Sequence, residues 1–347
     1  MPSADLACER TGLRSRARGP RYVLAVRDAS GGKALTPDIS VVVPTYRRPD
    51  RVIRLVSALE RQTLAKHRFE VVIVDNASPD DTLARLAPVA DASPLDIRVF
   101  VQHRRGPAAT RNAGWRAARA DLVAFIDDDC VPDPNWLTAG VAALDQDDRV
   151  GVLQGCTRKP PDAPLGDWTL WRQILGPTPY FEGCNIFYRR AALEQTGGFD
   201  EGIGNYGEDA SLGWSVIEAG WVRGFAKDAV VYHDVEERGL RFHLKTGLLE
   251  RNVARVAKHH PGFRDEAFWR PWAFRRENAA FTLAVAGLLL AVWRRPAALL
   301  VIPYLRLRVP PRAHPRWARL FLERALVDSA QFAGMRVGSL RYRLAVL

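Results

Sequence analysis

Cysteine is scarce in this sequence, and the four cysteines form no recognisable motif. Cys8, Cys130, Cys156 and Cys184 are far apart, with no Cys-x-x-Cys pair and no cluster of cysteine with histidine. This spacing excludes the common zinc modules and provides no disulfide framework. We therefore expect a protein of a reducing compartment.

An apolar signal segment is missing from the first residues. Met1–Arg21 has no run of the kind that a secretory signal peptide needs, so we expect none. Five arginines fall between Arg10 and Arg21, together with glycine and proline. This composition predicts a basic, disordered leader over residues 1–36, in which Tyr22–Val26 is a candidate strand.

A long uncharged run is also missing. The C-terminal part offers Asn278–Trp293, 16 residues without a charge, and the shorter Ala297–Leu305, which Pro303 interrupts. A straight membrane span needs about 20 residues. Arginines bracket both pieces: Arg275, Arg276, Arg294, Arg295, Arg306 and Arg308. A re-entrant or in-plane membrane attachment fits this pattern better than two spans, and a buried helix of a helical subdomain is the alternative.

The formal charge of +11 is unevenly distributed along the chain. Residues 1–36 carry +4, residues 37–238 carry −7, and residues 239–347 carry +14. An acidic middle argues against a nucleic-acid protein whose main domain is a basic platform. A catalytic body on a basic tail that meets phosphates or an anionic membrane surface agrees better with this distribution.

Short apolar runs of strand type alternate with helical patterns through the acidic middle. Predicted strands are 38–44, 69–75, 97–101, 122–126, 150–157, 184–189 and 230–233, and predicted helices are 49–61, a segment starting at 80, 107–119 and 210–219. This alternation predicts an α/β fold with a doubly wound, mostly parallel sheet. No Gly-x-Gly-x-x-Gly fingerprint follows the first strand, which leads into Pro44–Tyr46, so a dehydrogenase is disfavoured.

Three consecutive carboxylates, Asp127, Asp128 and Asp129, follow the strand at 122–126. Charges at the carboxyl end of a buried parallel strand lie at the sheet edge where α/β proteins bind ligands. Adjacent carboxylates repel one another unless a cation lies among them, and oxygen ligands suit Mg²⁺ or Mn²⁺. The simpler alternative is a solvated acidic turn.

Seven stretches in order resemble family 2 glycosyltransferases, the inverting nucleotide-sugar enzymes of the GT-A fold. They are Ser40–Arg48, Val74–Thr82, Arg104–Gly114, Phe125–Asp129, Gly183–Arg190, Gly197–Glu201 and Gly207–Asp209. The resemblance implies a GT-A domain, with a Rossmann-like nucleotide-binding half, at residues 37–238. Residues 239–347 then form a helical, basic region that we expect to associate with a membrane.

The resemblance implies a divalent metal, Mg or Mn, held by Asp127 and Asp129 of the DXD motif and by His233. We favour Asp129 as the direct ligand, with Asp127 or Asp128 nearer the ribose or sugar, but the triplet leaves Asp128 open as the ligand. A lone histidine is more often a surface or core residue. Its place at the end of an apolar strand favours metal binding here.

Nucleotide contacts are implied for Pro44, Tyr46, Asp75 and Arg105, besides Asp127 and Asp128. Asp75 ends a strand and is expected at the nucleobase, although a strand-end aspartate can instead cap the next helix. Arg104 or Arg105 can neutralise phosphate or hold the base, and Arg111 is expected to be structural.

Asp209 is the implied general base for the acceptor hydroxyl. Without the resemblance, acidic residues at a helix start are explained by the helix dipole. Glu208 is expected to orient the acceptor or stabilise the loop, and Gly183 and Asn185 to shape the sugar and acceptor pocket.

These features predict transfer of one sugar from a UDP-, GDP- or dTDP-sugar to a lipid-linked or cell-envelope glycan, at the cytoplasmic face of the cell membrane. The Gln-x-x-Arg-Trp motif of polymerising members is missing from 238–258, which disfavours processive synthesis. The alternatives are a polyprenyl-phosphate sugar synthase, whose acceptor phosphate needs no base, and a non-catalytic nucleotide-sugar-binding membrane protein.

Overall fold

A nine-stranded sheet forms the centre of the molecule in this computed structural model, which describes residues 21–25, 36–309 and 316–346. Its order is β1-β4-β3-β2-β5-β9-β7-β10-β6. The strands are β1 Arg21–Ala25, β2 Ile39–Thr45, β3 Phe69–Asp75, β4 Asp96–Val101, β5 Leu122–Ile126, β6 Cys130–Pro132, β7 Val150–Arg158, β9 Asn185–Arg189 and β10 Val222–His233. Strands β8 (Thr169–Leu170) and β11 (Glu236–Glu237) form a separate small sheet.

The sheet has parallel pairs at its centre and antiparallel pairs elsewhere. Strands β4, β3, β2 and β5 are parallel neighbours, and β7 and β10 form a second parallel pair. Strand β9 runs antiparallel between them, while β1 and β6 add antiparallel edges. The predicted α/β fold is thereby confirmed, and so is a strand near Tyr22–Val26.

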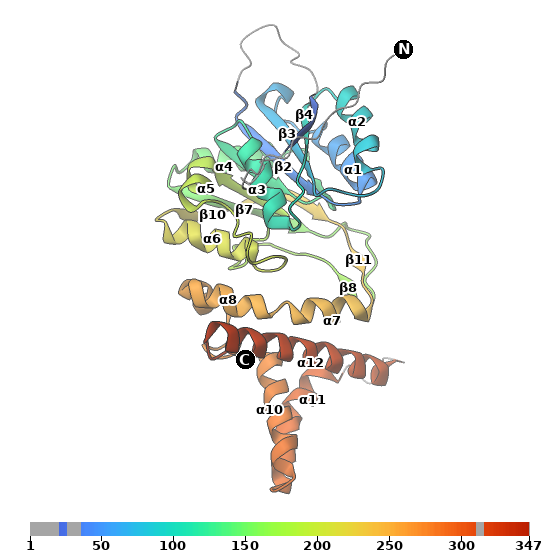
Figure 1. Ribbon diagram of the computed structural model, residues 1–347, viewed down its shortest axis with the longest axis vertical. Coiled ribbons are helices and arrows are strands. Elements are labelled where there is room, and N and C mark those ends of the chain that lie inside the picture. Colours follow the sequence, from blue (N-terminus) through green and yellow to red (C-terminus); the bar gives the residue numbers. More distant parts are fainter. Residues whose placement is uncertain (1–20, 26–35, 310–315, 347) are drawn as a thin grey trace, which may run out of the picture.

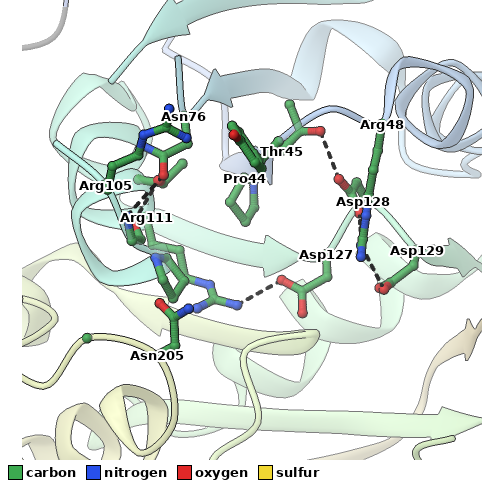
Figure 2. Close-up of a pocket in the computed structure, with 15 residues that line it drawn as sticks. Pro44, Thr45, Arg48, Asn76, Arg105, Arg111, Asp127, Asp128, Asp129 and Asn205 are labelled. Carbon is green, nitrogen blue, oxygen red and sulfur yellow. Dashed lines mark hydrogen bonds and ion pairs between the residues drawn. The ribbon is translucent and has the colours of Figure 1, made fainter. Parts of the chain in front are cut away.

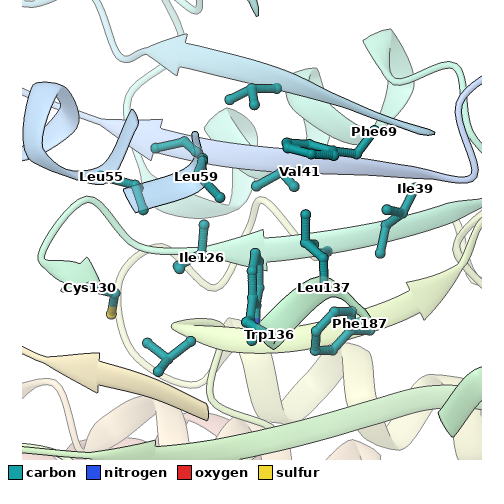
Figure 3. Close-up of a cluster of buried hydrophobic side chains, with 14 of the residues drawn as sticks. Ile39, Val41, Leu55, Leu59, Phe69, Ile126, Cys130, Trp136, Leu137 and Phe187 are labelled. Atoms are coloured by element: carbon teal, nitrogen blue, oxygen red, sulfur yellow. The ribbon is translucent and has the colours of Figure 1, made fainter. Parts of the chain in front are cut away.

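Helices cover both faces of the sheet because β2 and β3 are apolar on both sides (Figure 1). Val41 and Val43 face one core, which α1 (Pro49–Leu59), α2 (Thr82–Ala92) and α4 (Trp136–Asp145) complete (Figure 3). Val42 faces the other core, beneath α3 (Pro107–Ala117), α5 (Arg190–Thr196) and α6 (Glu208–Glu218). Fully buried parallel strands of this kind read as continuous apolar runs in the sequence.

Several elements were not predicted. Helix α5 has seven residues, too few to show a helical period, and α4 and β6 follow the acidic triplet where the pattern is irregular. Strand β10 begins at Val222, eight residues before its predicted start at Val230. The prediction missed the first part of the strand, where the register against β7 shifts between Ala226 and Val230. Lys227 and Asp228 fall in that irregularity and interrupt the apolar run.

The C-terminal helices form a layer below the GT-A-like body (Figure 1). This layer contains α7 Leu240–Leu248, α8 Arg251–His259, α9 Pro261–Ala267 and α12 Trp317–Tyr342. Side chains of α8, α9 and α12 share the second core with the sheet, for example Val253 and Met335. The boundary expected at residue 238 is therefore a change of architecture within one continuous core.

A helical hairpin projects from this layer. It consists of α10 (Arg276–Ala291), the 3₁₀ segment η2 (Arg295–Val301) and α11 (Ile302–Arg308), and we call it the apolar hairpin. Among the described residues, no helix combines the length and the apolar character that crossing a bilayer requires.

Candidate active site

A cavity of about 640 Å³ opens at the carboxyl ends of β2 and β5, beside the start of α3 (Figure 2). Six predicted site residues line it: Pro44, Tyr46, Arg105, Asp127, Asp128 and Asp129. Asp75, Gly183, Asn185, Glu208, Asp209 and His233 are not among the residues that line this cavity. The cavity therefore brings together most of the residues predicted to contact the nucleotide, and the predicted base and His233 are not part of its lining.

The three aspartates after β5 differ in their contacts, although Arg48 contacts both Asp128 and Asp129 (Figure 2). Asp127 accepts a hydrogen bond from Arg111 Nη2 at 2.8 Å. Asp128 is 4% exposed and accepts from Thr45 Oγ1 at 2.8 Å and from Arg48 Nη1 at 3.0 Å. Burial raises the pKa of Asp128 to about 6, against the attraction of Arg48. Asp128 and Asp129 thus share Arg48, but Thr45 binds Asp128 and His233 lies beside Asp129.

Asp129 lies beside His233, as a shared metal site requires. Asp129 Oδ1 is 3.6 Å from His233 Nε2. His233 Nδ1 donates to the carbonyl oxygen of Asp234 at 2.7 Å, so the lone pair of Nε2 is free on the side of Asp129. The pairing of β10 with β6 produces this contact, because His233 is the register partner of Cys130.

The donor atoms at this point fit a divalent cation. Asp129, Cys130 and His233 each offer a ligand atom, all within 4.8 Å of one another. Burial raises the pKa of the Cys130 thiol well above its ordinary value, so it stays protonated and is a poor ligand. One carboxylate and one imidazole remain, a set that accommodates Mn²⁺ or Mg²⁺ together with phosphate oxygens. Arg48 and Arg51 also approach Asp129 Oδ2, at 3.2 and 3.4 Å.

Arg111 joins the acidic triplet to the predicted base. Only 6% of its side chain is exposed, and it contacts Asp127 at 2.8 Å, Glu208 at 3.2 Å and Asp209 at 3.3 Å. Burial by itself lowers the pKa of Arg111, but attraction from the three carboxylates outweighs burial and raises it. The sequence prediction of a structural arginine missed this role. The available signal was its place one turn into α3, the helix that starts at the cavity.

Asp209 lies at the start of α6, and both of its carboxylate oxygens face groups of the protein. Its Oδ2 accepts from the backbone N–H of Gly183 at 2.9 Å, while Oδ1 faces Arg111. Burial raises the pKa of Asp209, and Arg111 opposes that rise. A Cβ at Gly183 would come within 2.9 Å of Asp209 Oδ1, so glycine is required for this approach.

Glu208 stabilises the loop before α6. Its Oε2 accepts from the N–H of Tyr206 at 2.9 Å, and its Oε1 accepts from Arg111. Burial, followed by repulsion from Asp209, raises the pKa of Glu208 to about 7. The structure therefore places Glu208 in the support of the base rather than on a cavity wall.

One wall of the cavity has an aromatic and cationic surface. The guanidinium of Arg105 lies over the ring of Tyr46, 4.8 Å from its centroid, and 38% of Tyr46 is exposed. Such a pair can stack on a nucleobase. Asn76 shapes the same wall, accepting from the N–H of Gly106 at 3.0 Å and donating to the carbonyl of Arg104 at 2.8 Å.

Two predicted residues are buried instead of lining the cavity. Asp75 is 0% exposed and accepts hydrogen bonds from the N–H and hydroxyl of Ser78, so it neither reaches the cavity wall nor caps α2. Asn185 donates to the carbonyls of Cys156 and Ala229 and accepts from Trp136. Asn185 therefore links strands inside the sheet rather than shaping an acceptor pocket. The predicted contact of Asp75 with a nucleobase stays a prediction.

Comparison with known proteins supports the resemblance. Residues 40–197 match the model of Glycosyl transferase family 2. Validoxylamine A glucosyltransferase of Streptomyces hygroscopicus subsp. limoneus is 28% identical over 278 residues, covering 69% of this chain and 60% of that protein. Pre-mycofactocin glycosyltransferase of Mycobacterium tuberculosis is 27% identical over 65% of this chain and 48% of its own length.

A solved structure shares the fold. The mannosyltransferase PcManGT from Pyrobaculum calidifontis, in complex with GDP-Man and Mn²⁺, superposes with a TM-score of 0.65 at 22% sequence identity. The match covers 87% of this chain and 88% of that one. The domain around the cavity is thus a GT-A domain. Residues 40–197 of this domain thus match glycosyl transferase family 2, and the chain is similar to glycosyltransferases over about two thirds of its length.

Proposed function

We propose that the enzyme transfers a single sugar from a nucleoside-diphosphate sugar to an acceptor hydroxyl, with inversion and with the help of a divalent metal. One observation carries this proposal: Arg111 touches both Asp127 at the cavity and Asp209 outside it. The donor side and the base are therefore adjacent, as direct transfer between two bound substrates requires.

The donor side has the parts that a nucleotide-sugar needs. A cavity of about 640 Å³ lies within the ordinary size range of small-molecule sites, and Tyr46 with Arg105 supplies a stacking surface. Asp129 and His233 would hold Mg²⁺ or Mn²⁺, with Asp127 nearby and Asp128 engaged elsewhere. The metal would stabilise negative charge on the departing diphosphate.

Asp209 would take the acceptor's proton. The N–H of Gly183 fixes Oδ2, and the guanidinium of Arg111 favours the ionised carboxylate. The acceptor oxygen then forms a bond to the anomeric carbon as the bond from that carbon to the diphosphate oxygen breaks, and the proton passes to Asp209. A positioned base of this kind contributes about 10²–10⁴-fold to the rate.

The acceptor in this proposal is a lipid-linked or cell-envelope glycan at the cytoplasmic membrane face. The C-terminal charge of +14 in residues 239–347 supports an anionic surface as the place of work. The names of two relatives describe glucosyl transfer to validoxylamine A and glycosyl transfer to pre-mycofactocin. The matches cover only 60% and 48% of those proteins, so the acceptor of this chain is a matter for experiment.

The test is a thermal-shift screen of UDP-, GDP- and dTDP-sugars with Mn²⁺ or Mg²⁺, since a ligand that binds the native state raises its melting temperature. GDP-mannose with Mn²⁺ is a sensible first pair, because the Pyrobaculum enzyme holds both. Sugar release from the stabilising donor is then measured with candidate acceptors.

Each rival function predicts a different result. A polyprenyl-phosphate sugar synthase would keep full turnover in Asp209→Asn, because its acceptor is already an anion. A nucleotide-sugar sensor would bind the donor but release no sugar with any acceptor, including lipid phosphates. Either result contradicts the proposed transfer to a hydroxyl.

A further inference from the structure

The apolar hairpin lacks the polar face of an ordinary surface helix. In α10, no charged residue occurs between Asn278 and Ala291, and the buried positions are all small or polar: Asn278, Ala279, Ala280, Ala284 and Gly287. A soluble helix normally has one apolar stripe, and a helix that is apolar all round is normally buried in protein or in lipid. Here the helix projects from the C-terminal layer with η2 and α11 beside it, and its first turns pack on α12, where the rings of Phe281 and Phe332 are in contact (Figure 1).

Large apolar side chains are exposed along the outer part of the hairpin. Leu289 is 64% exposed, Val292 78%, Trp293 77% and Leu299 64%. Nearly half of the exposed large apolar side chains that the structure describes lie between Leu283 and Val309. An apolar surface this concentrated marks a binding surface for a partner or a membrane.

The charges of the apolar hairpin indicate which kind of partner fits its surface. Arg276 and Arg306 are exposed at its base and Arg294 and Arg295 at its tip, and Glu277 is the only acidic residue between 276 and 308. Apolar surface between exposed arginines matches a bilayer with anionic headgroups, where each basic side chain adds to binding. A neutral apolar partner would leave these arginines without a role.

The length of the hairpin limits how it can enter a bilayer. The 16 residues of α10 extend about 24 Å, less than the hydrocarbon thickness of about 30 Å. An upright hairpin would leave Arg294 and Arg295 inside the hydrocarbon, which is unfavourable. A hairpin lying nearly flat places the arginines of both ends at headgroup level and its leucines below them.

We propose that the apolar hairpin inserts, lying nearly flat, into the headgroup–acyl boundary of one leaflet of an anionic membrane, with Trp293 at the interface. This inference deepens the membrane location in the proposed function but depends on no step of sugar transfer. The hairpin starts beside Arg275, whose guanidinium is 3.4 Å from the hydroxyl of Tyr206, and Glu208 binds the N–H of that tyrosine. The acceptor side of the site is thus next to the attachment, and a lipid-borne acceptor could react without leaving the bilayer.

Vesicle co-sedimentation of the full chain tests the attachment. We expect binding to phosphatidylcholine vesicles containing about 30% phosphatidylglycerol at least tenfold above binding to phosphatidylcholine alone. Leu288→Glu combined with Leu289→Glu should lower this binding about tenfold or more. Leu165→Glu is the matched control, because Leu165 is 52% exposed in the catalytic domain and should leave binding unchanged. Equal binding of the double variant and the control would overturn the proposal.

Quenching of tryptophan fluorescence tests the depth. Lipids brominated near the headgroup should quench the bound protein more than lipids brominated near the bilayer centre, because interfacial insertion reaches only about 5–10 Å. Trp293→Phe should remove most of this quenching, while the fluorescence of the other tryptophans remains. Stronger quenching from the bilayer centre would contradict the flat orientation.

A second copy of the chain is the competing occupant. Sedimentation velocity without lipid distinguishes these two occupants. The proposal would be overturned if the native chain formed a dimer and did not bind vesicles, and if the double glutamate variant were a monomer. Failure of the membrane inference is distinguishable from failure of the catalytic one. Asp209→Asn should still bind vesicles, and the double glutamate variant should still bind nucleotide-sugar.

Discussion

At the catalytic edge of the sheet, Arg111 is buried and contacts three carboxylates. At the tip of the apolar hairpin, Arg294 and Arg295 are exposed, and no described carboxylate pairs with them. The same type of side chain thus pairs with buried carboxylates in one region and is exposed to solvent, where external anions can bind it, in the other. The difference lies in the neighbours, since a guanidinium stays charged in both places.

The largest effect should come from removing the buried arginine. Arg111→Ala leaves Asp127, Glu208 and Asp209 without their shared cation, and breaking a buried charge pair costs about 3–5 kcal/mol of folding free energy. Urea unfolding measures this loss. Arg116→Ala, on the same helix but with 48% of its side chain exposed, should cost about 1 kcal/mol or less. Similar losses in both variants would remove the contrast between buried and exposed arginines.

Loss of the base should affect turnover and not donor binding. Asp209→Asn keeps the shape of the side chain but removes the proton acceptor, so kcat should fall by at least about 10²-fold. Donor affinity, measured by calorimetry, should stay close to that of the native enzyme. Asp200→Asn, which alters an exposed carboxylate paired with Arg255, serves as control. Near-normal kcat in Asp209→Asn would show that proton transfer occurs elsewhere.

The metal concentration that activity requires should distinguish the roles of Asp128 and Asp129. Asp129→Asn and His233→Ala should each raise the Mn²⁺ concentration for half-maximal activity by about tenfold or more, since even groups behind metal ligands are worth that much. Asp128→Asn should change this concentration less, because Asp128 is buried against Thr45, whereas Asp129 lies beside His233. The opposite order would assign the metal to Asp128.

The smallest effect concerns pH. The pKa of Glu208 is raised to about 7 from an ordinary value of 4.5, so the native state binds a proton more tightly than the unfolded chain. This group therefore contributes most stability below about pH 4.5, and its contribution decreases as pH rises toward about 7. The melting temperature of Glu208→Gln should vary less between these pH values than that of the native protein. Parallel curves would exclude Glu208 as the titrating group.

The parts of the site that the sequence predicted are local in origin. The run from Leu122 to Asp129 shows a buried strand and its terminal charges within eight residues, and parallel strands bring such ends to one edge. His233 was found in the same way, at the end of its own strand. The overall α/β alternation rests on similarly local patterns, which is why the strand and helix positions before Cys130 agree with the structure.

The missed parts depend on long-range contacts. Arg111 acquires its role only where α3, β5 and α6 meet, and Asn185 looked like a pocket residue until three strands enclosed it. The contact of Asp75 with a nucleobase stays a prediction. Its strand ends at the expected edge, and its carboxylate accepts hydrogen bonds from Ser78 three residues later, a local contact that the strand pattern does not reveal.

The pairing of β6 with β10 has a consequence for how this enzyme can change. Because His233 is fixed opposite Cys130, the proposed metal ligands Asp129 and His233 form one unit although about a hundred residues separate them in the sequence. Insertions or exchanges in the intervening segment, especially the loop-rich stretch 159–179, need not alter that unit. Under the proposed function, acceptor recognition can therefore diversify, by natural variation or by loop grafting, while the proposed metal and donor sites stay unchanged.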